Sequence, residues 1–253
     1  MLLDKWFTFL KKAANAKSTL VLFHYAGGNS GIYRALTGLI TQPVNILALD
    51  LPGRAKRFNE PLIGDLHTAA GGIAQGMLDS KTMLSEHPLM FFGHSIGAKL
   101  AFEVSQLLQR NDGLKLRHLI VSGSGAPHIE RSMPNMHNLP QQEFIAQLRK
   151  YGGTPEALLD DMDLLELLMP MLRSDFKMAE LYRSRDSIPV ACNLTAFGGD
   201  SDETVAIPSL QAWSKHAGAG FETRIFSGGH FFLHQQERSV AQAIDDIILS
   251  TVQ

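Results

Sequence analysis

The segment 89–100, LMFFGHSIGAKL, restricts the fold of this chain more than any other stretch of the sequence. Residues 89–92 are apolar and have the length of a buried strand, and Leu100 and Val104 then begin a helical repeat. Ser95 stands between them in the pattern Gly-x-Ser-x-Gly, where a Cβ at either glycine would strike the neighbouring helix or strand. The pattern predicts a nucleophile elbow with Ser95 in a strained conformation above a sheet. An ordinary strand-to-helix turn is the alternative.

Apolar segments of strand length alternate with amphipathic segments along the chain. This alternation is typical of a mostly parallel sheet flanked by helices. We predict strands at 19–24, 45–49, 89–92, 116–121, 190–197 and 222–226, and helices at 32–40, 66–80, 208–215 and 237–250. The sequence therefore predicts a single α/β domain over residues 1–253.

Residues 133–185 break this alternation, because helical segments follow one another there without a strand. Gly152 ends the first of them, Thr154 caps a second, and Asp161 caps a long third that Pro170 interrupts. We predict that 133–185 is a helical insertion within the α/β domain, and we refer to it as the lid.

Charge and cysteine content exclude several classes of partner. The formal net charge is −2, with 23 basic and 25 acidic residues, so nothing favours nucleic acid or an anionic membrane. The one cysteine, Cys192, cannot form an internal disulfide, and no apolar stretch approaches 18 residues. Lys11 and Lys12 interrupt the N-terminal apolar run too early for a signal peptide. We expect a cytoplasmic protein that does not span a membrane, and a monomer.

Three residues that could cooperate follow different predicted strands, in the order Ser95, Asp202 or Asp200, and His230. A serine hydroxyl needs a base with a pKa near 7, and that base needs a carboxylate to fix its tautomer. Serine, acid and histidine occur in this order in the α/β-hydrolase fold. We therefore predict that fold and a catalytic triad.

The acid and the base have to be chosen among several candidates. Of ten histidines, His230 follows the last predicted strand, where the fold places the base. His230 and His234 are four residues apart, but no His-Glu-x-x-His pattern and no third ligand accompany them, so we expect no metal. Asp202 lies deeper in its loop and is our choice for the acid, with Asp200 as the alternative.

The glycine-rich loop after the first strand, Tyr25-Ala26-Gly27-Gly28, lets the backbone approach a ligand closely. It lacks the Gly-Lys-Ser/Thr ending of a phosphate-binding loop and the Gly-x-Gly-x-x-Gly of a dinucleotide site, so we expect no nucleotide and no cofactor. An oxyanion hole needs two backbone N–H groups. We predict that Ala26 and Ile96 supply them.

Methionine is concentrated in the lid. Its flexible side chain packs around ligands of different shapes, so a lid lining a broad acyl pocket is one interpretation, and packing of the lid onto the body is the other. The candidates for the pocket are Met133, Met136, Met169 and Met171.

Short sequences along nearly the whole chain resemble the stand-alone type II thioesterases that accompany non-ribosomal peptide and polyketide synthases. They are His24-Tyr25-Ala26-Gly27-Gly28, Leu51-Pro52-Gly53-Arg54, Phe92-Gly93-His94-Ser95-Ile96-Gly97-Ala98, Tyr151-Gly152-Gly153-Thr154-Pro155, Leu172-Arg173-Ser174-Asp175-Phe176 with Glu180 and Tyr182 behind it, and Gly228-Gly229-His230-Phe231-Phe232. Gly-His-Ser-x-Gly alone also fits lipases and esterases, whereas the combination is far more specific. One departure is that residues 1–17 look like a short helical leader, so we expect a shortened sheet.

The resemblance implies a hydrolase that removes acyl groups, held as thioesters, from the phosphopantetheine arm of a carrier domain, clearing mis-primed or stalled groups. Arg54, Lys56 and Arg57 could then meet the carrier, although a solvated turn is an equal alternative. The competing functions are a carboxylesterase or lipase acting on oxygen esters, an offloading thioesterase that releases a finished product, and a catalytically idle hydrolase fold that only binds a small molecule or a carrier.

Overall fold

One seven-stranded sheet forms the centre of the molecule, in the order β1-β3-β2-β4-β5-β6-β7. The computed structural model describes residues 3–111, 114–129, 135–185 and 188–251. All neighbouring strands are parallel except β1, which runs antiparallel to β3. The strands are β1 (Phe7–Lys11), β2 (Ser18–Phe23), β3 (Val44–Leu49), β4 (Leu89–His94), β5 (Leu116–Ser122), β6 (Asn193–Gly199) and β7 (Phe221–Phe226).

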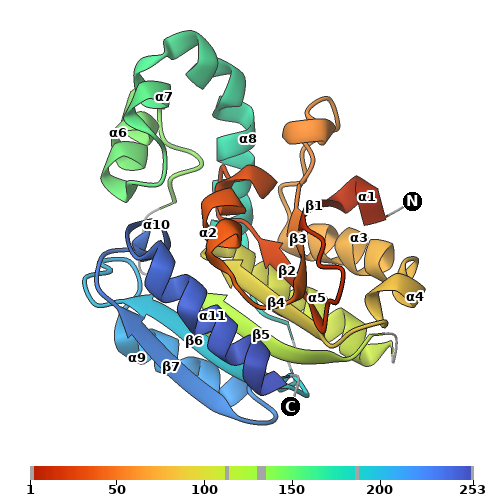
Figure 1. Ribbon diagram of the computed structural model, residues 1–253. Helices are drawn as coiled ribbons and strands as arrows, with labels where there is room; N and C mark the ends of the chain where they lie inside the picture. Colours follow the sequence, from red (N-terminus) through yellow and green to blue (C-terminus); the bar gives the residue numbers. More distant parts are fainter. Residues whose placement is uncertain (1–2, 112–113, 130–134, 186–187, 252–253) are drawn as a thin grey trace.

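Helices cover both faces of this sheet (Figure 1). Helices α2 and α11 contact each other on one face, and α3 and α5 contact each other on the opposite face. None of the described helices is both long and apolar enough to cross a membrane. The helices outside the lid are α1 (Leu3–Trp6), α2 (Arg34–Leu39), α3 (Leu66–Leu78), α4 (Lys81–Leu84), α5 (Ile96–Arg110), α9 (Ile207–Gln211), α10 (Phe232–Gln235) and α11 (Glu237–Thr251).

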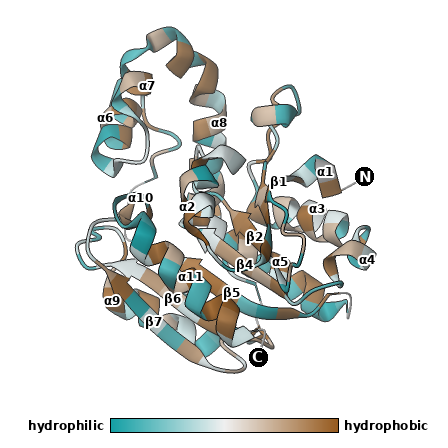
Figure 2. Ribbon diagram, in the orientation of Figure 1, coloured by the Kyte–Doolittle hydropathy of each residue, from teal (hydrophilic) through white to brown (hydrophobic). Residues whose placement is uncertain are grey.

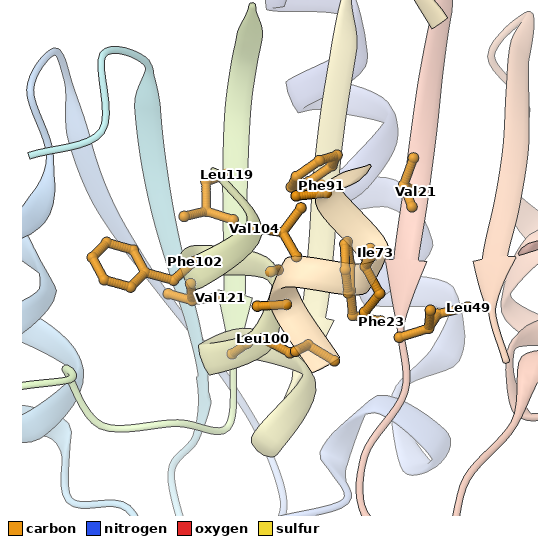
Figure 3. Packing of buried hydrophobic residues seen from close by; sticks show 14 of the residues in the cluster. Val21, Phe23, Leu49, Ile73, Phe91, Leu100, Phe102, Val104, Leu119 and Val121 are labelled. Atoms are coloured by element: carbon orange, nitrogen blue, oxygen red, sulfur yellow. The ribbon is translucent and has the colours of Figure 1, made fainter. Parts of the chain in front are cut away.

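The central strands read as almost continuous apolar runs because helices bury both of their faces. On one side, Val21, Phe91 and Leu119 meet Ile73 of α3 and Leu100 of α5 (Figure 3). Figure 2 shows hydrophobic residues concentrated in the central strands, whereas hydrophilic residues follow the outer helices. The predicted α/β-hydrolase architecture, a mostly parallel sheet between helices, is confirmed.

The prediction of a helical leader was wrong at its centre, because residues Phe7–Lys11 form strand β1. This strand pairs with the outer edge of β3, and Thr8 Oγ1 donates a hydrogen bond to Asp50 Oδ2 at 2.7 Å. The four residues before it, Leu3–Trp6, are helical. A five-residue run is too short to distinguish a strand from a helix by its own periodicity, and pairing with β3 decides the outcome.

The lid contributes three helices between β5 and β6, namely α6 (Gln141–Tyr151), α7 (Glu156–Asp160) and α8 (Met162–Leu181). Gly152, with φ 78°, ends α6, and the Asp161 side chain caps α8 by accepting from Leu164 N, both as predicted. Two details of the prediction were wrong. Thr154 does not cap α7, and α8 continues through Pro170 because the packing of its buried side chains offsets the missing N–H.

Candidate active site

The turn after β4 has the geometry that its glycines require. Ser95 has φ 58° and ψ −119°, a left-handed conformation that a residue with a side chain rarely adopts. A Cβ on Gly93 would lie 2.2 Å from the Gly97 carbonyl oxygen, and a Cβ on Gly97 would lie 2.2 Å from the Phe23 carbonyl oxygen. Any side chain at either glycine would therefore push α5 away from the sheet. The strained turn holds Ser95 at the N-terminus of α5.

His230 and Asp202 meet at the carboxyl edge of the sheet. His230 Nδ1 lies 2.9 Å from Asp202 Oδ2, and their side chains are only 5% and 1% exposed. Burial alone would raise the pKa of Asp202, but hydrogen bonding and charge from His230 more than offset it and hold that pKa below its ordinary value. Asp202 is therefore a carboxylate placed to fix the His230 tautomer.

Thr204 supports this pair and was missed by the sequence reasoning. Its hydroxyl donates to Asp202 Oδ1 at 2.7 Å and lies 3.0 Å from His230 Nδ1, while its backbone N–H donates to Asp202 Oδ1 at 2.8 Å. The available signal was Asp-x-Thr, since an aspartate in a loop often accepts from the N–H two residues later.

Asp200, the alternative acid, lies elsewhere. Its Oδ1 accepts the backbone N–H of Gly228 at 3.0 Å and the Ser201 hydroxyl at 2.7 Å. The residue is exposed to solvent, and it shapes the turn that precedes His230 without contacting the imidazole.

Ser95 and His230 line the same cavity, which has a volume of about 210 Å³. His230 Nε2 is buried and has no hydrogen-bond partner among the described residues, so no bond to Ser95 Oγ forms in this conformation. Such contacts are often long in the unliganded state and tighten around substrate. Other residues lining the cavity include Lys99, Ser124, Tyr151, Glu203 and Ser209.

Ala26 and Ile96, the predicted oxyanion donors, both lie near Ser95. Ala26 lines a small cavity together with Ser95, and Ile96 is the residue directly after the serine at the start of α5. Neither N–H group has a hydrogen-bond partner within the described part of the chain. An oxyanion hole requires two N–H groups without other partners, and these two meet that requirement.

The neighbouring histidines have local partners. His94 Nδ1 lies 2.8 Å from Ser122 Oγ, and its ring is packed against the ring of His230 with centroids 5.2 Å apart. His234 Nε2 lies 3.0 Å from the Tyr25 hydroxyl. No group of three potential metal ligands occurs among the residues that the structure describes.

The lid methionines divide into different environments. Met136 and Met169 belong to a hydrophobic cluster within the lid, with Phe144 and Leu165 among its members. Met171 belongs to that cluster and also lines a separate cavity beside Ala26 and Gly27. Met133 lies outside the described residues. Among the described residues no methionine lines the cavity shared by Ser95 and His230, so the packing interpretation accounts for Met136 and Met169.

For Arg54 and Arg57 both alternatives, contact with a carrier and a solvated turn, were wrong, because both side chains are buried. Arg54 is 4% exposed and pairs with Asp175, and Arg57 is 3% exposed and pairs with Glu60. Lys56 donates to the Phe7 carbonyl oxygen at 2.7 Å. The turn uses these cations to bind its own chain.

The burial of His24 predicts that the folded protein loses stability in acid. Burial and the Arg54 charge lower the pKa of His24 to about 4 in the folded protein. The unfolded chain therefore binds the proton first, and stability is kept above pH 6.5 but lost as the pH falls toward 4. At pH 5 the loss amounts to about 2 kcal/mol.

Urea unfolding at pH 7.5 and pH 5 should show at least this loss in the wild type, and a loss about 2 kcal/mol smaller in His24→Asn. An asparagine amide can still donate to the Tyr25 carbonyl oxygen, which His24 Nδ1 contacts at 2.8 Å, but does not titrate. Equal pH dependence in the two proteins would contradict the assignment.

Comparisons with known proteins agree on one family. A family model described as Thioesterase domain matches residues 18–248. Thioesterase PikA5 of Streptomyces venezuelae is 33% identical over 246 residues, which is 97% of this chain and 86% of the relative. Linear gramicidin dehydrogenase LgrE of Brevibacillus parabrevis is 36% identical over 250 residues, 98% of this chain and 94% of the relative. The type II thioesterase BorB from the borrelidin biosynthetic cluster superposes with a TM-score of 0.84 at 29% identity, covering 98% of both chains.

Proposed function

The chain belongs to the thioesterase family, and we propose that it is a stand-alone type II thioesterase, which hydrolyses acyl thioesters held on the phosphopantetheine arm of carrier domains. The observation that carries the proposal is the convergence of Ser95, His230 and Asp202 at the carboxyl edge of the sheet within a member of this family. The lid over residues 133–185 would cover the acyl group.

In the proposed reaction, Ser95 Oγ attacks the thioester carbonyl carbon while His230 Nε2 takes the hydroxyl proton. The Ala26 and Ile96 N–H groups hold the oxyanion, and Asp202 stabilises the imidazolium. The C–S bond then breaks, the sulfur leaves with the proton from His230, and an acyl-serine remains. Water repeats the same steps and releases the acid.

The carrier domain and the cellular setting are part of the same proposal. Two relatives, the gramicidin S biosynthesis protein GrsT and the thioesterase PikA5, support the proposal that the partner is a carrier domain with phosphopantetheine. We infer a monomer that works in the cytoplasm, and light scattering of the purified chain tests the first of these. LgrE is named a dehydrogenase, but this sequence lacks the Gly-x-Gly-x-x-Gly turn of a dinucleotide site.

The proposal predicts a preference for carrier-bound thioesters. Acetyl-, propionyl- and aminoacyl-loaded carrier domains should be hydrolysed with kcat/KM at least about tenfold above that for oxygen esters of the same acids, equivalent to about 1.4 kcal/mol. The physical reason is a better leaving group together with binding energy from the carrier.

Hydrolysis of acyl-pantetheine without the carrier measures the effect of the thiol leaving group alone, and the difference from the loaded carrier measures the effect of carrier binding. Faster turnover of the oxygen esters would favour a carboxylesterase. A full-length product thioester used in parallel distinguishes offloading from removal of short acyl groups. Failure of a fluorophosphonate to label Ser95 would favour a hydrolase fold that binds a ligand without catalysis.

A further inference from the structure

Asp175, on lid helix α8, bonds directly to the glycine-rich loop after β2. Its Oδ2 accepts the Gly27 N–H at 2.8 Å and Arg54 Nη1 at 2.7 Å, and its Oδ1 accepts Arg54 Nη2 at 2.7 Å. Arg54 Nη1 also donates to the Gly28 carbonyl oxygen at 3.0 Å. The lid, the loop and the turn after β3 therefore meet in one hydrogen-bonded cluster.

This cluster is shielded from water. Asp175 is 2% exposed. Burial favours the neutral acid, but the Arg54 guanidinium and the Gly27 N–H more than offset it and keep the pKa of Asp175 below its ordinary value. A two-pronged arginine–carboxylate pair is also geometrically specific. Loss of either partner would leave a buried charge without compensation.

The hydrogen bonds restrain both peptide planes that flank Ala26. The plane between Tyr25 and Ala26 is held through the Tyr25 carbonyl oxygen, which Gly28 N–H contacts at 3.0 Å and His24 Nδ1 at 2.8 Å. In a trans peptide the N–H points opposite the carbonyl, so these bonds also orient the Ala26 N–H. The next plane is held by Asp175 through the Gly27 N–H.

Packing presses α8 onto the same loop. A Cβ added to Gly27 would lie 2.6 Å from Leu172 Cδ2, one helical turn before Asp175. Gly27 has φ +78°, so the loop conformation and the close approach of α8 both require glycine here. The contact with α8 is thus made by a hydrophobic side chain as well as by the ion pair.

We infer that Asp175 is a positioning residue. Together with Arg54, it holds lid helix α8 against the glycine-rich loop after β2 and aligns the Ala26 N–H with the oxyanion. The inference rests on the proposed function, because it concerns the stabilisation of the tetrahedral intermediate. It means that the oxyanion hole keeps its geometry only while α8 is seated on the loop.

The test compares Asp175→Asn with Asp245→Asn in the full chain. Asp245 is an equally buried carboxylate that accepts Thr41 N–H at 2.9 Å and Gln42 N–H at 3.1 Å, away from the lid. Both variants should lose thermal stability. Only Asp175→Asn should lower kcat, by about 10- to 100-fold with KM within about threefold, since a displaced oxyanion donor acts on the transition state.

Two further measurements separate positioning from folding. The affinity for an alkyl boronic acid, which forms a tetrahedral adduct on serine, should fall in Asp175→Asn by about the same factor as kcat. Arg54→Lys keeps the positive charge but cannot form the two-pronged pair, and it should lower kcat about tenfold even if Asp175→Asn does not fold.

The outcomes distinguish the inference from the proposed function. Unchanged kcat in a folded Asp175→Asn or Arg54→Lys variant, with Ser95→Ala inactive, overturns the inference alone. A kcat loss of equal size in Asp245→Asn also overturns it, because a general effect of destabilisation then suffices. Thioester hydrolysis that does not depend on Ser95 overturns the proposed function instead.

Discussion

Replacing Ser95 with alanine should lower the turnover of acyl-carrier thioesters by about 10⁶-fold. The substitution removes the hydroxyl group that attacks the thioester carbonyl carbon, while the oxyanion donors and the cavity remain. Residual activity would come from binding and oxyanion stabilisation alone. Single-turnover measurements, with acyl release followed by mass spectrometry, can detect rates that differ by this factor.

A matched control is Ser105→Ala, which also removes a serine of α5. The Ser105 hydroxyl donates to the Phe102 carbonyl oxygen at 2.6 Å, within the helix. This variant should keep wild-type turnover and fluorophosphonate labelling, whereas Ser95→Ala should lose both. Turnover of Ser95→Ala near the wild-type rate would exclude Ser95 as the nucleophile.

Asp202→Asn should reduce kcat by about 10⁴-fold. Asparagine presents an N–H group to His230 Nδ1, which favours the tautomer with its proton on Nε2 and so removes the base that Ser95 needs. The size and shape of the side chain are unchanged, so the fold should persist.

Asp200→Asn is the companion variant, since it alters a carboxylate two residues earlier in the same loop. It removes the charge of the carboxylate that accepts the Gly228 N–H at the surface, where water screens the interaction, so the effect on stability should be small. Its kcat should stay within a few-fold of the wild type. A larger loss in Asp200→Asn than in Asp202→Asn would reverse the two assignments.

The elbow could be predicted from sequence because its requirements are local. Ser95 needs glycine two residues away on each side, and the apolar periods before and after it identify a strand and a helix. The fold class follows for the same reason, from repeated alternation along the chain. His230 could be selected because it comes after the last strand.

Features that depend on tertiary contacts could not be predicted. Strand β1 exists through pairing with the edge of β3, and α8 continues through Pro170 because the lid packs around it. Arg54 looked like a surface cation, since nothing nearby in sequence shows that Asp175, 121 positions later, lies against it. The sequence favoured Asp202 over Asp200 only by its place in the loop, and the contact of Asp202 with the His230 imidazole is seen only in the folded protein.

The hydrophobic cluster within the lid has an evolutionary consequence. Phe144, Leu165 and Met169 pack mainly with one another and apart from the two clusters that cover the sheet. Free-energy changes at well-separated sites add nearly independently. A lineage can therefore exchange Phe144, Leu165 or Met169 with little effect on the stability of the sheet.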